Sequence, residues 1–199
     1  MPYRKPIQQR AIDSESKFLE TLEMLLHQQS FEDTSIEQIA SLSNQTKSAF
    51  IKRFGTKEEA LFVLFKIYAE EASKTMQSVL ATMDTTKPLI HTLQMVSNTF
   101  DELLQKHFAA NRAMNEFVKR QLESHDLTKQ IFGECIQMMV KIQHGWFGNE
   151  YSLEGSKAAA QILVSINFHY RMGAMPALPE EVQRRHELIA ELIEVAIKH

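Results

Sequence analysis

Short polar and basic side chains cluster in the stretch 46–57 of this chain. They are Thr46, Lys47, Ser48, Lys52, Arg53 and Lys57. Ammonium and guanidinium groups bind phosphate oxygens, and small hydroxyl side chains can reach the edges of bases in a nucleic-acid groove. The residue types therefore suit contact with a polyanion, provided that one element presents them together.

Two short helices and a tight turn are expected to position these groups. The apolar residues of the first helix follow the i, i+3, i+4 spacing of one helical face: Ile36, Ile39, Ala40 and Leu42. Two capping boxes compete for its start, a T-x-x-E from Thr34 and an S-x-x-Q from Ser35. The sequence leaves both starts open.

The turn and the second helix follow directly. Asn44 lies where the chain must reverse, and Asn tolerates the left-handed conformation. Thr46 can cap a helix over 47–54, which Gly55 ends. Its inward face is Ala49, Phe50 and Phe54, and its opposite face is Lys47, Ser48, Ile51 and Lys52. This pattern predicts a helix-turn-helix whose second helix faces a partner.

The segments TSIEQIA at 34–40 and TKSAFIKRFGTKEEAL at 46–61 resemble the DNA-binding region of TetR/AcrR-type transcriptional regulators. The resemblance covers about residues 14–65. It implies a dimeric regulator, most often a repressor, that binds a palindromic double-stranded DNA operator and is released by a small ligand. The residues it implies for DNA contact are Arg4, Lys5, Arg10, Ser35, Thr46, Lys47, Ser48, Ala49, Ile51, Lys52 and Lys57.

Three positions depart from the family pattern. Gln45 replaces the usual Val under the turn, and Asn44 replaces the usual Gly. Ile51 replaces a Tyr whose hydroxyl meets a phosphate in relatives, so one backbone contact is expected to be missing. These changes motivate an alternative function, a ligand-binding or protein-interaction scaffold of the same fold with weak or lost DNA binding.

Charge and composition suit a soluble DNA-binding protein. Residues 1–57 hold eight Lys and Arg against seven Asp and Glu, and residues 58–199 hold fourteen against eighteen. The basic tip on a more acidic body favours phosphate contact. Cys135 is the single cysteine, which is compatible with a reducing compartment. The polar N-terminus and the lack of any long apolar run predict a cytoplasmic protein with no membrane partner.

The whole chain is expected to be all-α. An arm over 1–13 and a supporting helix over 17–31 precede the helix-turn-helix at 35–54. The later helices are expected at 56–83, 88–108, 111–123, 126–147, 154–172 and 180–198. We therefore predict a three-helix DNA-binding domain with an N-terminal arm over 1–55. A helical domain for ligand binding and dimerisation is predicted over 56–199.

Enzymatic chemistry finds no support in the spacing of reactive residues. The chain has eight His, but it has no Glu-x-x-His, His-x-x-x-His or Cys-x-x-Cys pattern. Cys135 sits among apolar residues, as a small buried hydrophobe does. We predict no enzymatic activity, no metal and no cofactor.

Met and aromatic residues of the C-terminal half suit an adaptable apolar pocket or an ordinary core. Because the resemblance implies ligand sensing, we predict a cavity for a small apolar or amphipathic effector. Its expected lining is Phe100, Phe108, Phe117, Phe132, Met139, Trp146 and His169. The wide apolar face of the last helix predicts a homodimer through the last two helices.

Overall fold

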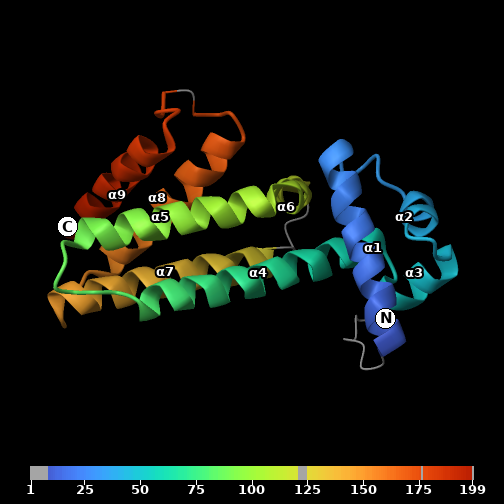
Figure 1. The fold of residues 1–199 in the computed structure, drawn as a ribbon, viewed down its shortest axis with the longest axis horizontal. Coiled ribbons are helices and arrows are strands. Elements are labelled where there is room, and N and C mark those ends of the chain that lie inside the picture. Colours follow the sequence, from blue (N-terminus) through green and yellow to red (C-terminus); the bar gives the residue numbers. More distant parts are fainter. Residues whose placement is uncertain (1–8, 121–124, 176, 199) are drawn as a thin grey trace. The chain divides into compact units, whose positions relative to one another are not determined.

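The computed structural model describes residues 9–120, 125–175 and 177–198, and helices are the only regular secondary structure in these ranges (Figure 1). The prediction of an all-α chain is confirmed. None of the described helices is long and apolar enough to cross a bilayer. The helices are α1 (Gln9–Gln28), α2 (Ile36–Leu42), α3 (Lys47–Phe54), α4 (Lys57–Ala81), α5 (Leu89–Lys106), α6 (Phe108–Arg120), α7 (His125–Phe147), α8 (Leu153–Arg171) and α9 (Val182–Lys198).

The chain forms two compact units that are not continuous in sequence. The first contains the residues up to Tyr68 and the segment 107–123, and the second contains 69–106 and the residues from 124 onward. Helix α4 therefore contributes its first half to one unit and its second half to the other. The assignment of DNA binding to 1–55 and of ligand binding and dimerisation to 56–199 stays a prediction.

An aromatic cluster forms the centre of the first unit. Phe18 of α1 packs edge-on against Phe50 and Phe54 of α3, with ring centroids 5.2 and 6.1 Å apart. All three rings are 1% exposed or less. Helix α6 also belongs to this unit, and its Arg112 donates from Nη2 to the carbonyl oxygen of Leu26 at 2.8 Å. The edge-to-face packing of Phe18 against the two Phe rings of α3 stabilises the position of α3 in addition to the burial of their apolar surface.

Two helix starts differ from the predicted ones by three residues or more. Helix α1 begins at Gln9, so the expected arm over 1–13 is wrong for its last five residues, and Arg10 is helical. The first turn gains support from Gln9, whose Nε2 donates to Asp13 Oδ1 at 2.8 Å across an i, i+4 spacing. Helix α6 begins at Phe108 in place of residue 111, because the apolar face of its first turn, Ala109 and Ala110, is buried in the first unit.

Helices α5, α7, α8 and α9 build most of the core of the second unit. Leu93, Met139, Leu163, Ile189 and Ile193 are fully buried in it. A close approach between α8 and α9 requires a glycine, because a Cβ atom on Gly155 would lie 2.7 Å from the carbonyl oxygen of Ala196. The absence of a side chain at Gly155 therefore lets α8 and α9 pack closely against each other.

A buried ionic cluster joins α5, α8 and α9 in the same unit. Asp101, which is 3% exposed, accepts two hydrogen bonds from Arg171 at 2.7 and 2.6 Å and one from Arg185 at 3.2 Å. His186 Nε2 lies 3.6 Å from the same carboxylate, and Ser97 Oγ lies 2.9 Å from His186 Nδ1. Burial alone raises the pKa of the Asp101 carboxyl. The contacts with His186 and Arg171 and the charges of Arg171 and Arg185 outweigh it and bring that pKa well below its usual range.

Candidate nucleic-acid interface and ligand cavity

Capping interactions fix both helices of the helix-turn-helix. Ser35 Oγ accepts from the backbone N–H of Gln38 at 3.1 Å, and Gln38 Oε1 accepts from the N–H of Ser35 at 2.8 Å. Of the two possible capping boxes, the chain forms this one. Thr34 is buried instead, and its hydroxyl donates to the carbonyl oxygen of Ser30 at 2.9 Å. Asn44 has the predicted left-handed conformation, with φ of 54°.

Helix α3 presents the expected two faces. It runs from Lys47 to Phe54, and the Thr46 hydroxyl accepts from the backbone N–H of Ala49 at 3.1 Å to cap it. Phe50 and Phe54 are buried, and Ala49 is half-buried. The exposed residues form what we term the α3 outer face: Thr46, Lys47, Ser48, Ile51 and Lys52. Five residues predicted to contact DNA thus share one surface.

The cations on and beside this face differ in how they are paired. Lys47 forms an ion pair with Glu37 of α2, and this hydrogen bond lowers the pKa of Glu37. Arg53 lies 3.6 Å from Glu15 of α1, between Nε and Oε2. Lys52 is exposed and forms no hydrogen bond or ion pair within the part of the chain that the structure describes. Among the three, Lys52 can take up a phosphate without leaving an acidic partner.

Lys57, at the start of α4, holds the loop between α1 and α2. Its Nζ donates to the carbonyl oxygens of Phe31, Glu32 and Thr34 at 2.6, 3.2 and 2.7 Å, and it lies 4.5 Å from the centroid of the Phe31 ring. An ammonium group has three donors, so all three are used. Burial lowers the pKa of Lys57. A phosphate contact from Lys57 would require one of these bonds to break.

Gln45 is held by α1, a contact that the sequence did not predict. Its Nε2 donates to the carbonyl oxygen of Ser14 at 2.9 Å, and its Oε1 accepts from the Ser14 hydroxyl. The amide that replaces an apolar residue under the turn is therefore paired. The two residues lie 31 positions apart, and nothing local in the sequence marks them as partners.

The remaining residues predicted to contact DNA are more scattered. Arg4 and Lys5 lie outside the described residues. Arg10 is exposed on α1, and Ser35 is half-buried and occupied as the cap of α2. For all of these residues, contact with DNA stays a prediction.

The structure does not bring the seven predicted ligand-binding residues together. Phe108 and Phe117 belong to the first unit, where Phe117 packs against Phe31 and Phe62, and the other five belong to the second. Met139 is fully buried in the core, and Phe132 packs against it.

The last two of the seven make polar contacts with the backbone. Trp146 donates from Nε1 to the carbonyl oxygen of Lys87 at 3.2 Å. His169 is exposed, with Nδ1 2.7 Å from the carbonyl oxygen of Ser165.

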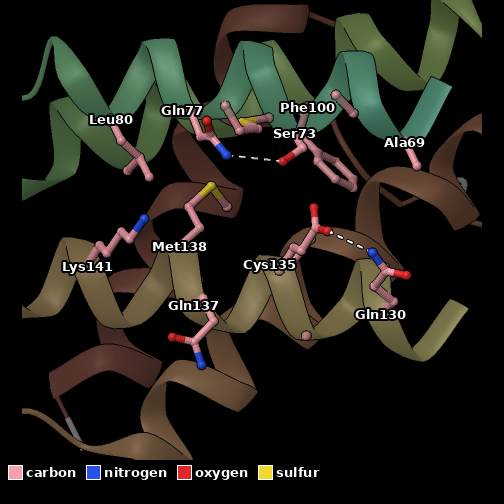
Figure 2. A pocket seen from close by; sticks show the side chains of 14 residues that line it. Ala69, Ser73, Gln77, Leu80, Phe100, Gln130, Cys135, Gln137, Met138 and Lys141 are labelled. Atoms are coloured by element: carbon pink, nitrogen blue, oxygen red, sulfur yellow. Dashed lines mark hydrogen bonds between the residues drawn. The ribbon is translucent and has the colours of Figure 1, made fainter. Parts of the chain in front are cut away.

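A cavity of about 500 Å³ lies in the second unit between α4 and α7, with Phe100 of α5 as a further wall (Figure 2). Of the seven predicted residues, Phe100 alone lines it. Its volume falls within the range of small-molecule sites. The other lining residues are Ala69, Ala72, Ser73, Met76, Gln77, Leu80, Gln130, Gly133, Glu134, Cys135, Gln137, Met138 and Lys141.

The surroundings of the thiol in this cavity disfavour the thiolate form. Cys135 is buried, and burial together with the nearby Glu134 charge raises its pKa to about 12. A protonated thiol at neutral pH does not attack an electrophile readily. Among the described residues, no three His, Cys, Asp or Glu side chains are grouped closely enough to hold a metal ion.

A sequence comparison with known proteins matches part of the first unit. Residues 18–63 match the sequence profile of the family described as bacterial regulatory proteins, tetR family. The matched segment begins in α1 and ends in α4, so it includes the whole helix-turn-helix. No curated protein sequence matches the chain.

Solved structures match the chain along nearly its whole length. A protein from Mesorhizobium loti assigned to the TetR-family transcriptional regulators is 13% identical, with 94% of this chain and 98% of that one covered and a TM-score of 0.71. A transcriptional regulator from Rhodococcus sp. is 13% identical, with 93% and 98% covered and a TM-score of 0.70. The fatty acid degradation regulator FadR from Bacillus halodurans is 12% identical, with 95% and 96% covered and a TM-score of 0.69. At these identities the likeness shows a shared fold.

Proposed function

We propose that this chain, which belongs to the tetR family of bacterial regulatory proteins, represses transcription as a homodimer that leaves its DNA operator when a small ligand binds. Members of this family are DNA-binding transcription factors and not enzymes. The finer points of operator symmetry, dimerisation, repression and ligand release are our proposals. We place the protein in the cytoplasm, where its DNA partner lies.

The α3 outer face is the observation that carries DNA binding. A recognition helix enters the major groove with one face, while its other face holds it to the domain. Helix α3 has such a division, because Phe50 and Phe54 are buried and the hydroxyl and basic side chains are exposed. Lys47 and Lys52 would meet phosphates, and Thr46 and Ser48 would approach base edges.

Lys52→Ala is expected to weaken operator binding and to lower the slope of log affinity against log salt by about one for each protomer. The reason is that an unpaired ammonium releases counterions when it neutralises a phosphate. Titrations of labelled duplex at several salt concentrations measure both quantities. Lys74→Ala is the matched control, since Lys74 is an exposed lysine in the part of α4 that belongs to the second unit.

Glu37→Gln separates the two lysines of α3. Without the carboxylate, Lys47 no longer has to leave an ion pair to reach a phosphate, so DNA affinity is expected to rise. Lys47→Ala in the Glu37→Gln background should then reduce DNA affinity more than it does in the wild type. If Lys52→Ala and Lys47→Ala both leave affinity and salt slope unchanged, α3 does not dock as proposed. A wild type with no salt-dependent DNA affinity would favour the scaffold function instead.

The homodimer is proposed to form through α8 and α9. On α9, Leu192 and Val195 are 41% and 60% exposed, whereas Ile189 and Ile193 are buried in the core of their own unit. On α8, Leu153 is 50% exposed. A two-fold interface would cover these apolar side chains on both protomers at once.

The pair of substitutions Leu192→Glu and Val195→Glu is expected to convert a dimer to a monomer at micromolar concentration. Each carboxylate would be buried without a partner, and two-fold symmetry doubles the cost. Sedimentation equilibrium gives the mass directly. Met95→Glu, on the partly exposed face of α5, is the control for adding an acidic group to the same unit. A monomeric wild type would refute this interface.

Release from DNA is assigned to the cavity between α4 and α7. A ligand shifts a conformational equilibrium only by binding one state better than the other. Helix α4 starts beside the helix-turn-helix and lines the cavity with its second half, from Ala69 to Leu80. Ligand binding at that half is therefore proposed to favour a conformation with lower DNA affinity, and the same coupling must make DNA lower the ligand affinity.

A further inference from the structure

Two side chains of opposite charge on α7 line the cavity. Glu134 and Lys141 both line it and are seven residues apart. Seven residues are about two helical turns, so the two side chains share one face of α7 and are separated by about 10 Å along its axis. Figure 2 shows Lys141 at the end of the cavity near Leu80, with Gln130 toward the other end.

The two charges differ in how they are paired. Glu134 accepts a hydrogen bond from Nε2 of Gln130 at 3.4 Å, one turn earlier on the same helix. Lys141 is exposed and has no hydrogen bond or ion pair among the residues that the structure describes. A cation at a cavity wall without a protein partner is available to an anionic group of a ligand.

Apolar side chains line much of the wall between the two charged residues, beside the polar Ser73 and Gln77 of α4. Met138 lies one turn before Lys141 on α7, and Leu80 lies opposite on α4 (Figure 2). Met76 of α4 lines the same cavity. Phe100 closes the wall from α5. Unbranched Met side chains adapt to flexible apolar guests, and the burial of each methylene of such a guest is favourable.

We propose that the cavity binds an amphipathic monoanion, with a flexible apolar body against Met76, Phe100 and Met138 and its anionic group beside Lys141. This inference rests on the proposal that the cavity is the effector site, and it names the chemical class of that effector. The reverse orientation is disfavoured, because it would place the anionic group of the ligand beside the Glu134 carboxylate. A carboxylate at the end of an alkyl chain is the simplest molecule of this class.

The test compares decanoate, decanol and decylammonium on the full-length protein by calorimetry at neutral pH. A partly exposed ion pair is worth up to about 1 kcal/mol, which corresponds to about fivefold in affinity. Lys141→Met should therefore reduce the preference for decanoate over decanol by up to about fivefold and leave decanol affinity unchanged. Lys141→Arg should keep the preference, and Lys157→Met, at an exposed position of α8, should have no effect.

A cavity-filling variant locates the binding. An added Cβ on Gly133 of α7 would meet no atom within 4 Å, and Gly133 lines the cavity. Gly133→Met should therefore fold normally and occupy the space, so that all three probes lose affinity. In the wild type, each methylene added to the chain between octanoate and decanoate should raise the affinity about fourfold.

The outcomes separate this inference from the proposed function. Tighter binding of decylammonium than of decanoate, or a decanoate preference that survives Lys141→Met, overturns the proposed ligand class. Failure of all three probes to bind overturns it as well. Decanoate binding that depends on Lys141 and Gly133 but leaves operator affinity unchanged supports the ligand class and removes the switch.

Discussion

Asp101→Ala is expected to lower the free energy of unfolding by about 3–5 kcal/mol, the usual cost of breaking a buried ion pair by removing one partner. The substitution leaves the guanidinium groups of Arg171 and Arg185 without their carboxylate, and Arg185 is 2% exposed. Urea unfolding followed by fluorescence measures the change, because the single tryptophan, Trp146, lies in the same unit. Glu102→Ala removes the adjacent, exposed carboxylate of α5 and should change the free energy by less than about 0.5 kcal/mol.

The same carboxylate predicts a pH dependence of definite sign. The pKa of Asp101 is lowered in the folded chain, and the unfolded value is about 3.9. The contribution of Asp101 is therefore fully present above the unfolded pKa and is lost as pH falls toward the folded pKa. The stability difference between wild type and Asp101→Asn should shrink as acid is added below about pH 4. A difference that stays constant down to pH 2 would contradict this account.

Phe50→Ala should lower the free energy of unfolding by about 3–5 kcal/mol, because it opens a cavity between α1 and α3 where the ring is fully buried. It also removes the edge-to-face contact with Phe18. DNA binding should also be lost, because the packing of the Phe50 ring against α1 fixes the orientation of α3 and of its outer face. Thermal unfolding by circular dichroism and operator titration give the two readouts.

Phe50→Leu is the graded control for this substitution. It keeps most of the apolar volume and should lower the free energy of unfolding clearly less than Phe50→Ala does. Ile51→Ala changes the next residue, which is 44% exposed, and should leave stability nearly unchanged. A loss below about 1 kcal/mol for Phe50→Ala would show that the ring is not a core residue.

The sequence was most informative where the determinants are local. Caps, a turn residue and an apolar spacing fall within about twenty residues of the helix-turn-helix, and they predicted α3, the left-handed Asn44 and the cap at Thr46. Only the choice between the boxes at Thr34 and Ser35 stayed open. Thr34 was the wrong candidate because its side chain is buried, and burial is decided by packing.

Contacts between distant positions could not be predicted in this way. Asp101 meets Arg171 and Arg185 across 70 and 84 positions, and no local pattern pairs them. Lys57 matches the family motif, but its three carbonyl partners lie 23 to 26 residues earlier. The bonds that occupy its ammonium depend on the folded path of the loop. The motif therefore predicts the position of Lys57 in the helix-turn-helix region but not its hydrogen-bond partners.

The candidate ligand site shows the same limit. Helical spacing predicts which residues turn inward. However, Met139 lies in the core and does not reach the cavity, whereas Met138, one position away, belongs to the core and also lines the cavity. Whether an inward side chain meets another side chain or a space depends on the fit of neighbouring helices. Polar lining residues such as Lys141 carry no apolar signal and were missed. The sequence alone offers no reason to single out that lysine.

The discontinuity of the first unit has a consequence for protein engineering. A chimera that joins only the N-terminal segment to a foreign regulatory domain would omit α6, which contributes Ala110, Ala113 and Met114 to the same core and the Arg112 bond to Leu26. The grafted module would expose the apolar surface that α6 covers, and exposed patches of this kind promote aggregation. A portable DNA-binding module from this chain therefore consists of two segments. The second has to be supplied by the graft or replaced by a recipient helix with matching small residues.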